Sequence, residues 1–278
     1  MQKDQLFTRR RMLLAGAAAL GAAGTAGVVV AGDGGEAART APPVAGPQAR
    51  QVLKSSAFRL QPLTGYGPPR AAPRKLKVRS EPILQISGRG RRMMLTYDDG
   101  PNPAYTPHIL DTLAKYRVRA MFFVCGECVV DNKELLARMA DEGHVVGNHT
   151  WTHPLLTSLD RGEIRSEMER TSDIIEDAYG ERPQWFRAPY GAWNRAAFQL
   201  GAEMGMEPMA WTVDTTDWET PGTGIIVDRV ESGAAPGVVV LSHDAGGDRS
   251  QSVHAIREYL PYLLDSGYDL VVPPRRTT

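Results

Sequence analysis

The sequence predicts an α/β protein whose core is a parallel sheet of about seven strands, either open or closed into a barrel. Two observations support this prediction. From about residue 90 onward, short apolar runs alternate with segments of helical periodicity. The polar residues that interrupt this pattern come directly after the predicted strands, where ligands bind in parallel α/β folds.

Each predicted strand is a short run of apolar and β-branched residues that ends at turn-forming residues. The expected strands cover residues 93–97, 119–124, 145–148, 185–187, 207–213, 238–241 and 270–272. One or two shorter strands are expected before the core, at 75–78 and 82–86.

Helices are expected between these strands, because apolar residues recur there at helical spacing. The first begins at residue 106, and the others cover 133–142, 160–179, 195–204, 225–231 and 253–264. The first starts with Thr106 followed by Pro107, a capping residue and then a favoured first helical position. Gly180 ends the longest predicted helix.

Residues 1–31 have the pattern of a targeting signal. Arg9, Arg10 and Arg11 precede an Ala- and Gly-rich apolar run, which resembles a bacterial twin-arginine export signal. The run at 12–30 is also about long enough to remain as a membrane anchor. We therefore expect a chain that is exported from a bacterial cytoplasm and is secreted, cell-wall associated or membrane-anchored.

Residues 32–89 are expected to form a linker rich in Pro, Ala and Gly, and residues 90–278 to form one catalytic domain. Residues 1–90 carry 14 Lys and Arg against 4 Asp and Glu, which leaves the remainder with a net charge of −10. An acidic main body argues against nucleic acid as a partner. We expect a monomer.

The only cysteines, Cys125 and Cys128, are spaced C-x-x-C. Such a pair is found in redox motifs, in halves of metal sites and in local disulfides. A second pair that would complete a zinc site is missing from the sequence. Because the pair follows a predicted strand and does not open a predicted helix, we favour structural thiols or a local disulfide.

Asp98 and Asp99 directly follow the first predicted strand and precede Gly100-Pro101, which forces a turn. Side chains alternate between the faces of a strand, but the chain bends at its end, so both carboxylates can reach one cleft. Two adjacent acids there suit a division of labour, in which one binds a cation and the other handles protons. Asp-Gly is also a common turn pair, so this short motif alone leaves both interpretations open.

His149 and His153 follow the third predicted strand, four residues apart. Their imidazoles can turn to a common metal ion. Position 150 is Thr, so this is not the H-E-x-x-H motif of a zinc protease. Together with a strand-end carboxylate, the pair predicts a His₂Asp site with an open position, which would polarise a carbonyl and activate a water.

The later strand ends carry further candidates. Arg187 can hold a carboxylate ionised, and the turn at Tyr190 fixes a backbone N–H that can point at developing oxyanion charge. Trp218 can line a sugar-sized cleft. His243 is placed as a general acid, and Asp214 is the candidate carboxylate that orients and charges it. Taken singly, each of these residues also has an ordinary structural explanation.

The ordered set T-Y-D-D-G-P, H-T-W-T-H, R-A-P-Y-G, D-T-T-D-W and L-S-H resembles the five motifs of the polysaccharide deacetylases. This family is carbohydrate esterase family 4, with the NodB homology domain. The resemblance covers roughly residues 90–273. It implies a distorted (β/α) barrel, usually with seven strands, and metal-dependent hydrolysis of N- or O-acetyl groups on sugars. Tyr97 stands where the family usually has Phe.

Carried over residue by residue, the resemblance gives each position a role. Asp98 would be the general base held by Arg187. Asp99, His149 and His153 would bind a divalent metal, usually zinc, with Co²⁺ or Ni²⁺ as alternatives. The Tyr190 backbone N–H would help form the oxyanion hole. His243 would be the general acid, tuned by Asp214. Leu241 and Trp218 would border the acetyl and sugar pocket.

The expected activity is removal of N-acetyl groups from an amino-sugar polysaccharide, either peptidoglycan or a chitin-type polymer. An O-acetyl esterase acting on acetylated xylan is an alternative, because the same site chemistry permits it. A non-catalytic glycan-binding module is a third, less favoured alternative, because every chemical position is filled.

Overall fold

The computed structural model describes residues 76–87 and 89–274. The expected export signal, the segment 12–30 and most of the expected linker lie outside these residues. Within the part of the chain that is described, no helix is long and apolar enough to cross a membrane.

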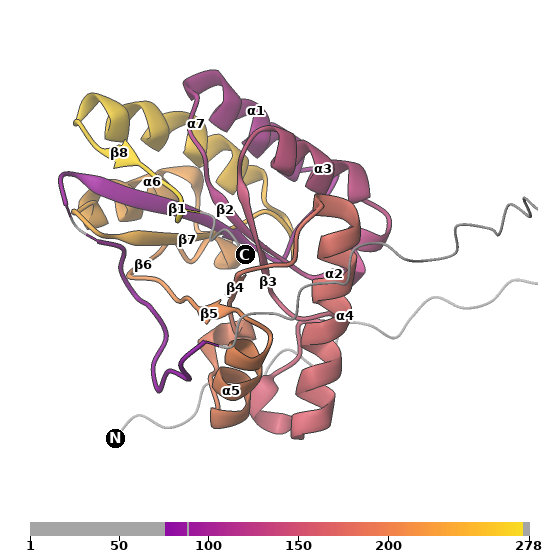
Figure 1. The fold of residues 1–278 in the computed structure, drawn as a ribbon. Helices are drawn as coiled ribbons and strands as arrows, with labels where there is room; N and C mark the ends of the chain where they lie inside the picture. The colour runs from indigo at the N-terminus through magenta and orange to yellow at the C-terminus, as the bar shows by residue number, and fades with distance from the viewer. Residues whose placement is uncertain (1–75, 88, 275–278) are drawn as a thin grey trace, which may run out of the picture. The chain divides into compact units, whose positions relative to one another are not determined.

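The predicted α/β fold with a parallel sheet is confirmed (Figure 1). The strands are β1 (Arg92–Asp98), β2 (Met121–Val124), β3 (Val145–Asn148), β4 (Trp185–Phe186), β5 (Glu207–Pro208), β6 (Val213–Asp214), β7 (Val239–His243) and β8 (Asp269–Leu270). They lie in the order β5-β4-β3-β2-β1-β7-β6, and β8 pairs with the beginning of β1. Every pairing between these strands is parallel.

The single strand predicted at 207–213 is wrong, because the segment forms two short strands, β5 and β6, at opposite edges of the row. Between them the backbone crosses from one edge to the other. The Met209 N–H bonds to the Phe186 carbonyl in β4, whereas the Thr212 N–H bonds to the Val239 carbonyl in β7. The described strands therefore form a partly open barrel.

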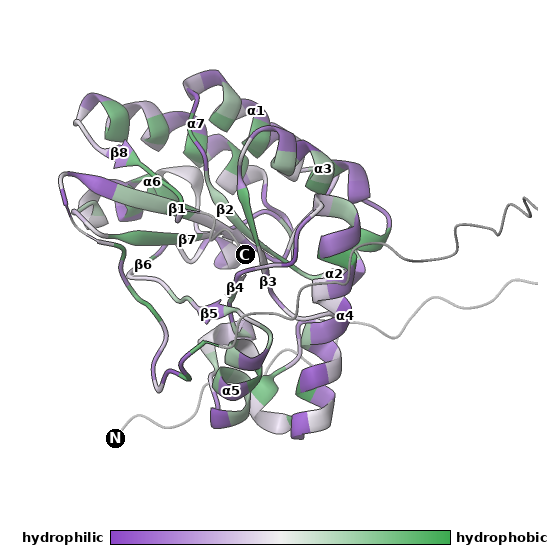
Figure 2. Cartoon of the chain, viewed as in Figure 1, coloured by the Kyte–Doolittle hydropathy of each residue, from purple (hydrophilic) through white to green (hydrophobic). Residues whose placement is uncertain are grey.

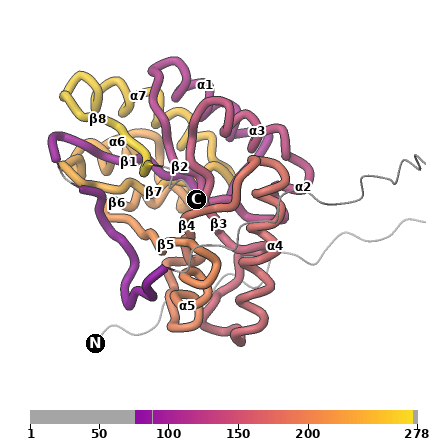
Figure 3. The backbone as a smooth tube through the Cα atoms, in the orientation of Figure 1, coloured from indigo at the N-terminus to yellow at the C-terminus, as the bar shows by residue number. Residues whose placement is uncertain are grey.

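The segment before β1 runs along the open side of the sheet (Figure 3). The strands predicted there, at 75–78 and 82–86, are wrong for the described residues, since only isolated bridges form, at Ile83 with Met209 and at Gln85 with Val238. Ile83 also accepts a hydrogen bond from the Ala210 N–H. This segment thus supplies partners for the backbone that crosses between β5 and β6.

All six predicted helices are present. They are α1 (Thr106–Tyr116), α3 (Lys133–Asp141), α4 (Arg161–Tyr179), α5 (Arg195–Glu203), α6 (Thr223–Gly233) and α7 (Ser250–Asp265). Three short 3₁₀ turns also occur: η1 (Leu156–Ser158), η2 (Pro189–Gly191) and η3 (Asp217–Glu219). Two of these turns, η2 and η3, follow strands whose carboxyl ends carry candidate site residues.

One further helix, α2 (Gly126–Val130), corrects the interpretation of the cysteines. Cys125 is its N-cap, and the Cys128 N–H bonds to the Cys125 carbonyl at 3.1 Å, so the C-x-x-C pair does open a helix. Both thiols are free. Burial raises the pKa of Cys125 well above its usual range and that of Cys128 to about 11. Of the alternatives, the structure favours structural thiols.

The two faces of β1 pack into different apolar clusters. Met93, Leu95 and Tyr97 join the large apolar cluster under the helices, together with residues of α1 and α7. Met94 belongs to a separate cluster on the other face, and the hydropathy colouring shows how apolar the central strands are (Figure 2). Alternation along the strand therefore puts Asp98 on the same face as Met94.

The helix α4 begins with a capping box. Asp160 accepts a hydrogen bond from the Glu163 N–H, and the Glu163 side chain accepts one from the Asp160 N–H, both at 2.8 Å. These reciprocal bonds satisfy two backbone donors that the helix itself leaves unpaired.

We expect Asp160→Ala to lower the free energy of unfolding by about 1 kcal/mol, because the N-cap acceptor is lost. Urea denaturation followed by circular dichroism measures this change. Asp228→Ala, at an exposed position on α6, is the matched control and should change stability by less than about 0.5 kcal/mol. Equal effects of the two substitutions would contradict the role of the cap.

Candidate metal centre

The candidate residues gather where the parallel strands end. Asp98 closes β1 and lies opposite His243, the last residue of β7. His149 directly follows β3, and Arg187 directly follows β4. Parallel strands bring their carboxyl ends to one edge, so residues up to 145 positions apart in the sequence become neighbours.

The carboxylates of Asp98 and Asp99 face the same imidazole, and the backbone explains how. Asp98 continues the alternation of β1, whereas Asp99 has a positive φ of 75° that turns its side chain away from the strand pattern. The His149 Nε2 lies 3.6 Å from Asp98 Oδ2 and 3.5 Å from Asp99 Oδ1. A single imidazole thus faces both carboxylates.

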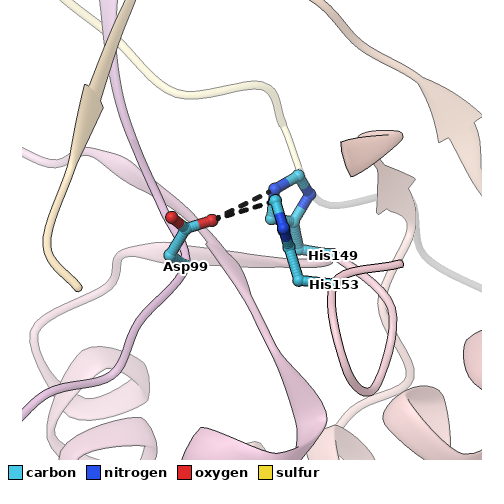
Figure 4. Close-up of side chains that lie close together, drawn as sticks. All are labelled: Asp99, His149 and His153. Carbon is cyan, nitrogen blue, oxygen red and sulfur yellow. Dashed lines mark ion pairs between the residues drawn. The ribbon is translucent and has the colours of Figure 1, made fainter. Parts of the chain in front are cut away.

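Asp99, His149 and His153 form a group that could hold a metal ion, with ligand atoms that all lie within 4.8 Å of one another. Figure 4 shows the Asp99 carboxylate facing both imidazoles. Asp99 Oδ1 lies 3.5 Å from His149 Nε2 and 3.3 Å from His153 Nε2. Tetrahedral ligands about 2.1 Å from a zinc ion would be roughly 3.4 Å apart, so the spacing fits.

The hydrogen bonding of Asp99 also fits a cation. Its Oδ1 is buried and has no hydrogen-bond partner among the described residues. Burial alone would raise the pKa of Asp99, but the nearby imidazoles of His149, His243 and His153 hold it far below its usual range. An ionised carboxylate oxygen without a donor is what a metal ligand requires.

The contacts of the two histidines suit a metal ion. The His149 Nδ1 lies 2.8 Å from the Arg187 carbonyl, so this nitrogen donates and Nε2 is the atom that faces the carboxylates. Burial, followed by the charge of His149, lowers the pKa of His153 to about 4. His153 is therefore neutral at neutral pH, as a metal ligand must be.

Arg187 holds Asp98, as predicted. The guanidinium is fully buried, and its Nη1 donates to Asp98 Oδ1 at 2.6 Å and to the Thr96 hydroxyl at 2.9 Å. Its carbon lies 4.1 Å from the centre of the Phe123 ring. This partnership leaves Asp98 Oδ2 facing the His149 Nε2, on the side of the candidate metal group.

The prediction that Asp214 orients His243 is wrong, because Asp217 does so. The His243 Nδ1 lies 2.7 Å from Asp217 Oδ1, and the His243 backbone N–H donates to Asp217 Oδ2 at 2.9 Å. Burial lowers the pKa of His243, but the hydrogen bond and charge of Asp217 outweigh it and raise the pKa to about 9.

Asp214 has another environment. Its Oδ1 accepts a hydrogen bond from the Thr216 N–H at 2.8 Å, which makes a local turn, and its charge acts on Arg187. The turn passes through Thr216, whose φ of 43° reverses the chain and brings Asp217 to His243. The D-T-T-D-W motif contained both acids, but the sequence carries no signal for this reversal.

The three remaining predicted residues lie around the group. Tyr190 has a φ of 60°, and its ring packs edge-on against the His153 ring with centroids 4.5 Å apart. Trp218 lies in η3 beside Asp217 and is partly exposed, and Leu241 is buried in β7 opposite Thr96. The oxyanion role of the Tyr190 N–H and the pocket roles of Leu241 and Trp218 stay predictions.

The loop after β7 was not predicted to contribute, yet it packs directly on the group. Arg249 is buried and donates to the carbonyls of Ala245, Gly246 and Asp217. Gly246 has a φ of +76°, and a Cβ there would lie 2.4 Å from Asp99 Oδ2. Only glycine therefore fits beside this carboxylate.

Comparisons with known proteins agree with this geometry. A sequence model described as polysaccharide deacetylase matches residues 86–209. The chitooligosaccharide deacetylase of Rhizobium leguminosarum bv. trifolii is 38% identical over 208 residues, which cover 71% of this chain and 97% of the relative.

Two solved structures are similar in fold. The Bc1960 peptidoglycan N-acetylglucosamine deacetylase has a TM-score of 0.66 and 34% identity, over 68% of this chain and 89% of that chain. BA3943 from Bacillus anthracis, a pseudoenzyme of carbohydrate esterase family 4, has a TM-score of 0.65 and 30% identity, over 70% of this chain and 67% of that chain.

We expect the His243 imidazole of the metal-free protein to titrate near the value of about 9 that its contacts give. Asp217→Asn removes the charge that raises this pKa and should lower the midpoint by about 1–3 pH units. A histidine NMR titration measures both midpoints, and His243→Gln assigns the signal.

Asp214→Asn is the matched control, because it removes an equal charge three residues away, at the end of β6, without touching His243. We expect the His243 midpoint of this variant to stay near that of the wild type. A midpoint that falls with Asp214→Asn and not with Asp217→Asn would contradict the partnership seen in the structure.

Proposed function

This chain belongs to the polysaccharide deacetylase family, and from that premise we propose that it hydrolyses N-acetyl groups of an amino-sugar polysaccharide with a divalent metal ion. The observation that supports this proposal is that a candidate metal group, a candidate base and a candidate acid lie at one edge of the sheet. The Asp99, His149 and His153 group lies beside a buried carboxylate, and His243 closes the neighbouring strand.

The metal would be held by Asp99, His149 and His153. We propose Zn²⁺, with Co²⁺ or Ni²⁺ as substitutes, because two imidazoles and a carboxylate with an open position suit these ions. When bound, the ion supplies Lewis acidity that polarises the acetyl carbonyl and makes a water molecule more acidic.

Asp98 is the proposed general base. Its Oδ1 is engaged by Arg187, so Oδ2, on the side of His149, is the oxygen that takes the proton from the attacking water. The Arg187 guanidinium keeps the carboxylate in place through the transfer. General-base catalysis of this kind contributes about 10²–10⁴ in rate.

His243 is the proposed general acid. At neutral pH it carries a proton, since its pKa is raised to about 9, and Asp217 fixes the ring through Nδ1. The Nε2 proton is then available to the leaving amine. We further propose that the Tyr190 N–H stabilises the oxyanion and that Trp218 and Leu241 border the sugar and acetyl groups.

We propose a bacterial envelope polymer as substrate, either peptidoglycan or a chitin-type glycan. The relatives named above act on chitooligosaccharide and on peptidoglycan, and the expected export signal agrees with an envelope location, secreted, wall-associated or anchored. A non-catalytic role, as in the BA3943 pseudoenzyme, is less consistent with this chain, because a residue of suitable chemistry occupies each proposed catalytic position.

Substrate and metal dependence are tested together. The purified protein is offered N-acetylglucosamine oligomers, peptidoglycan and acetylated xylan, and released acetate is measured. We expect acetate from the oligomers or peptidoglycan, loss of activity with a chelator and recovery with Zn²⁺ or Co²⁺. Acetate from xylan alone would identify an O-acetyl esterase, and acetate from none of the three would reject catalysis on these glycans.

Asp98→Asn and His243→Ala should each lower kcat by about 10²–10⁴-fold, since each removes one proton-transfer group. Neither is a proposed ligand, so both variants should keep bound metal, which elemental analysis measures. Asp111→Asn, on the exposed surface of α1, is the matched control and should retain full activity. If Asp98→Asn deacetylates at the wild-type rate, the assignment of the base is wrong.

A further inference from the structure

The segment between the two histidine ligands has an unfavourable backbone conformation. Thr150 has a φ of 70° and His153 a φ of 55°, which are left-handed values that residues other than glycine rarely adopt. A β-branched Thr in this region is a clear outlier. Such conformations persist only where surrounding contacts hold them.

Glu167 of α4 supplies such contacts. Its Oε2 accepts hydrogen bonds from the backbone N–H groups of Trp151 and Thr152, both at 2.8 Å. Its Oε1 accepts a third hydrogen bond, from the Thr152 hydroxyl at 3.1 Å. One carboxylate from another element therefore binds the middle of the H-T-W-T-H segment at three points.

Other backbone groups of the segment are bonded by other parts of the chain. The N–H groups of Gly126 and Glu127, at the start of α2, donate to the carbonyls of Thr150 and Trp151 at 3.0 and 3.2 Å. The Thr150 N–H donates to the Asn148 side chain at 2.9 Å. Helix α2 thus supplies donors, and Glu167 is the acceptor for two of the three N–H groups between the histidines.

A carboxylate suits this position better than an amide. The two groups at Oε2 are N–H donors, whereas the Thr152 hydroxyl at Oε1 can donate or accept. A glutamine could therefore keep its oxygen on the N–H groups and turn its NH₂ group to the hydroxyl oxygen. It would still lose the charge, which strengthens each of these hydrogen bonds.

We propose that Glu167 is a metal-positioning residue, which holds the chain between the left-handed residues Thr150 and His153 and thereby fixes the separation of the His149 and His153 imidazoles. Partners outside the ligand set that fix ligand geometry typically change metal affinity 10–100-fold when they are removed. This proposal rests on the metal centre of the proposed function but does not depend on which glycan is cleaved.

The test measures metal binding and not turnover. Dissociation constants for Zn²⁺ come from competition with a chromophoric chelator, and the Co²⁺ absorption spectrum reports ligand geometry. We expect Glu167→Ala, which removes both acceptor oxygens, to weaken Zn²⁺ binding at least about tenfold and to alter the Co²⁺ spectrum. Glu167→Gln, which can keep the three contacts but loses the charge, should weaken Zn²⁺ binding less than Glu167→Ala does.

Glu169→Gln is the matched control. It lies on the same helix, two residues away, and its carboxylate pairs with Arg165 at 2.9 Å on the surface. We expect the wild-type dissociation constant and Co²⁺ spectrum for this variant. If this control loses as much Zn²⁺ affinity as the Glu167 variants, the effect belongs to helix α4 in general, and the proposal is overturned.

Thermal unfolding of the metal-free proteins separates positioning from stability. A merely structural Glu167 would lower the metal-free Tm while leaving the metal dissociation constant and spectrum unchanged, and that result overturns the proposal. If Glu167→Ala does not fold, Glu167→Met, which keeps the side-chain volume but removes both acceptor oxygens, decides. A wild type that binds no metal overturns the proposed metal centre as well, whereas equal affinities of wild type and variants overturn only the role of Glu167.

Discussion

The buried ion pair of Arg187 and Asp98 is the interaction on which the rest of the structure depends. Burying a charged guanidinium is costly unless it is paired and hydrogen-bonded, and the hydrogen bonds of Arg187 hold three parts of the fold together. Nη1 reaches Asp98 and Thr96 in β1, whereas Nε and Nη2 donate to the carbonyls of Met209 and Ala210. Those carbonyls lie in the backbone that crosses between β5 and β6. A side chain therefore completes the barrel where strand pairing stops.

The same edge of the sheet shows how two adjacent acids acquire different roles. Asp98 stays in the pattern of β1 and is committed to Arg187. Asp99 leaves that pattern through its positive φ, and its Oδ1 faces two imidazoles. Gly246 is required at its present position because a side chain there would collide with Asp99. The division of labour thus follows from one backbone dihedral and the space left beside it, and not from the chemistry of the residue type.

The sequence was informative where function coincides with strand ends. Asp99 comes just after one predicted strand, and His149 and His153 lie in the loop after another, so their convergence could be predicted from the rule for parallel sheets. Asp217 could not be distinguished from Asp214, because the choice depends on the left-handed turn at Thr216. Glu167 was also not predictable, since it is one of several acids on a helix and meets the histidine segment only through the packing of α4. The five-residue helix α2 is too short to show a periodic pattern.

Two imidazoles in this cluster have opposite protonation states for a reason that the structure shows directly. His153 and His243 are both largely buried, and burial lowers the pKa of each. For His153 a second imidazole lies 4.9 Å away and adds to that effect, and the pKa falls to about 4. For His243 the Asp217 carboxylate lies 2.7 Å from Nδ1 and outweighs the effect of burial, so the pKa rises to about 9. Between these pKa values the His153 ring is neutral, as the proposed metal ligand must be, while the His243 ring holds a proton. Asp217 therefore decides which histidine can act as an acid.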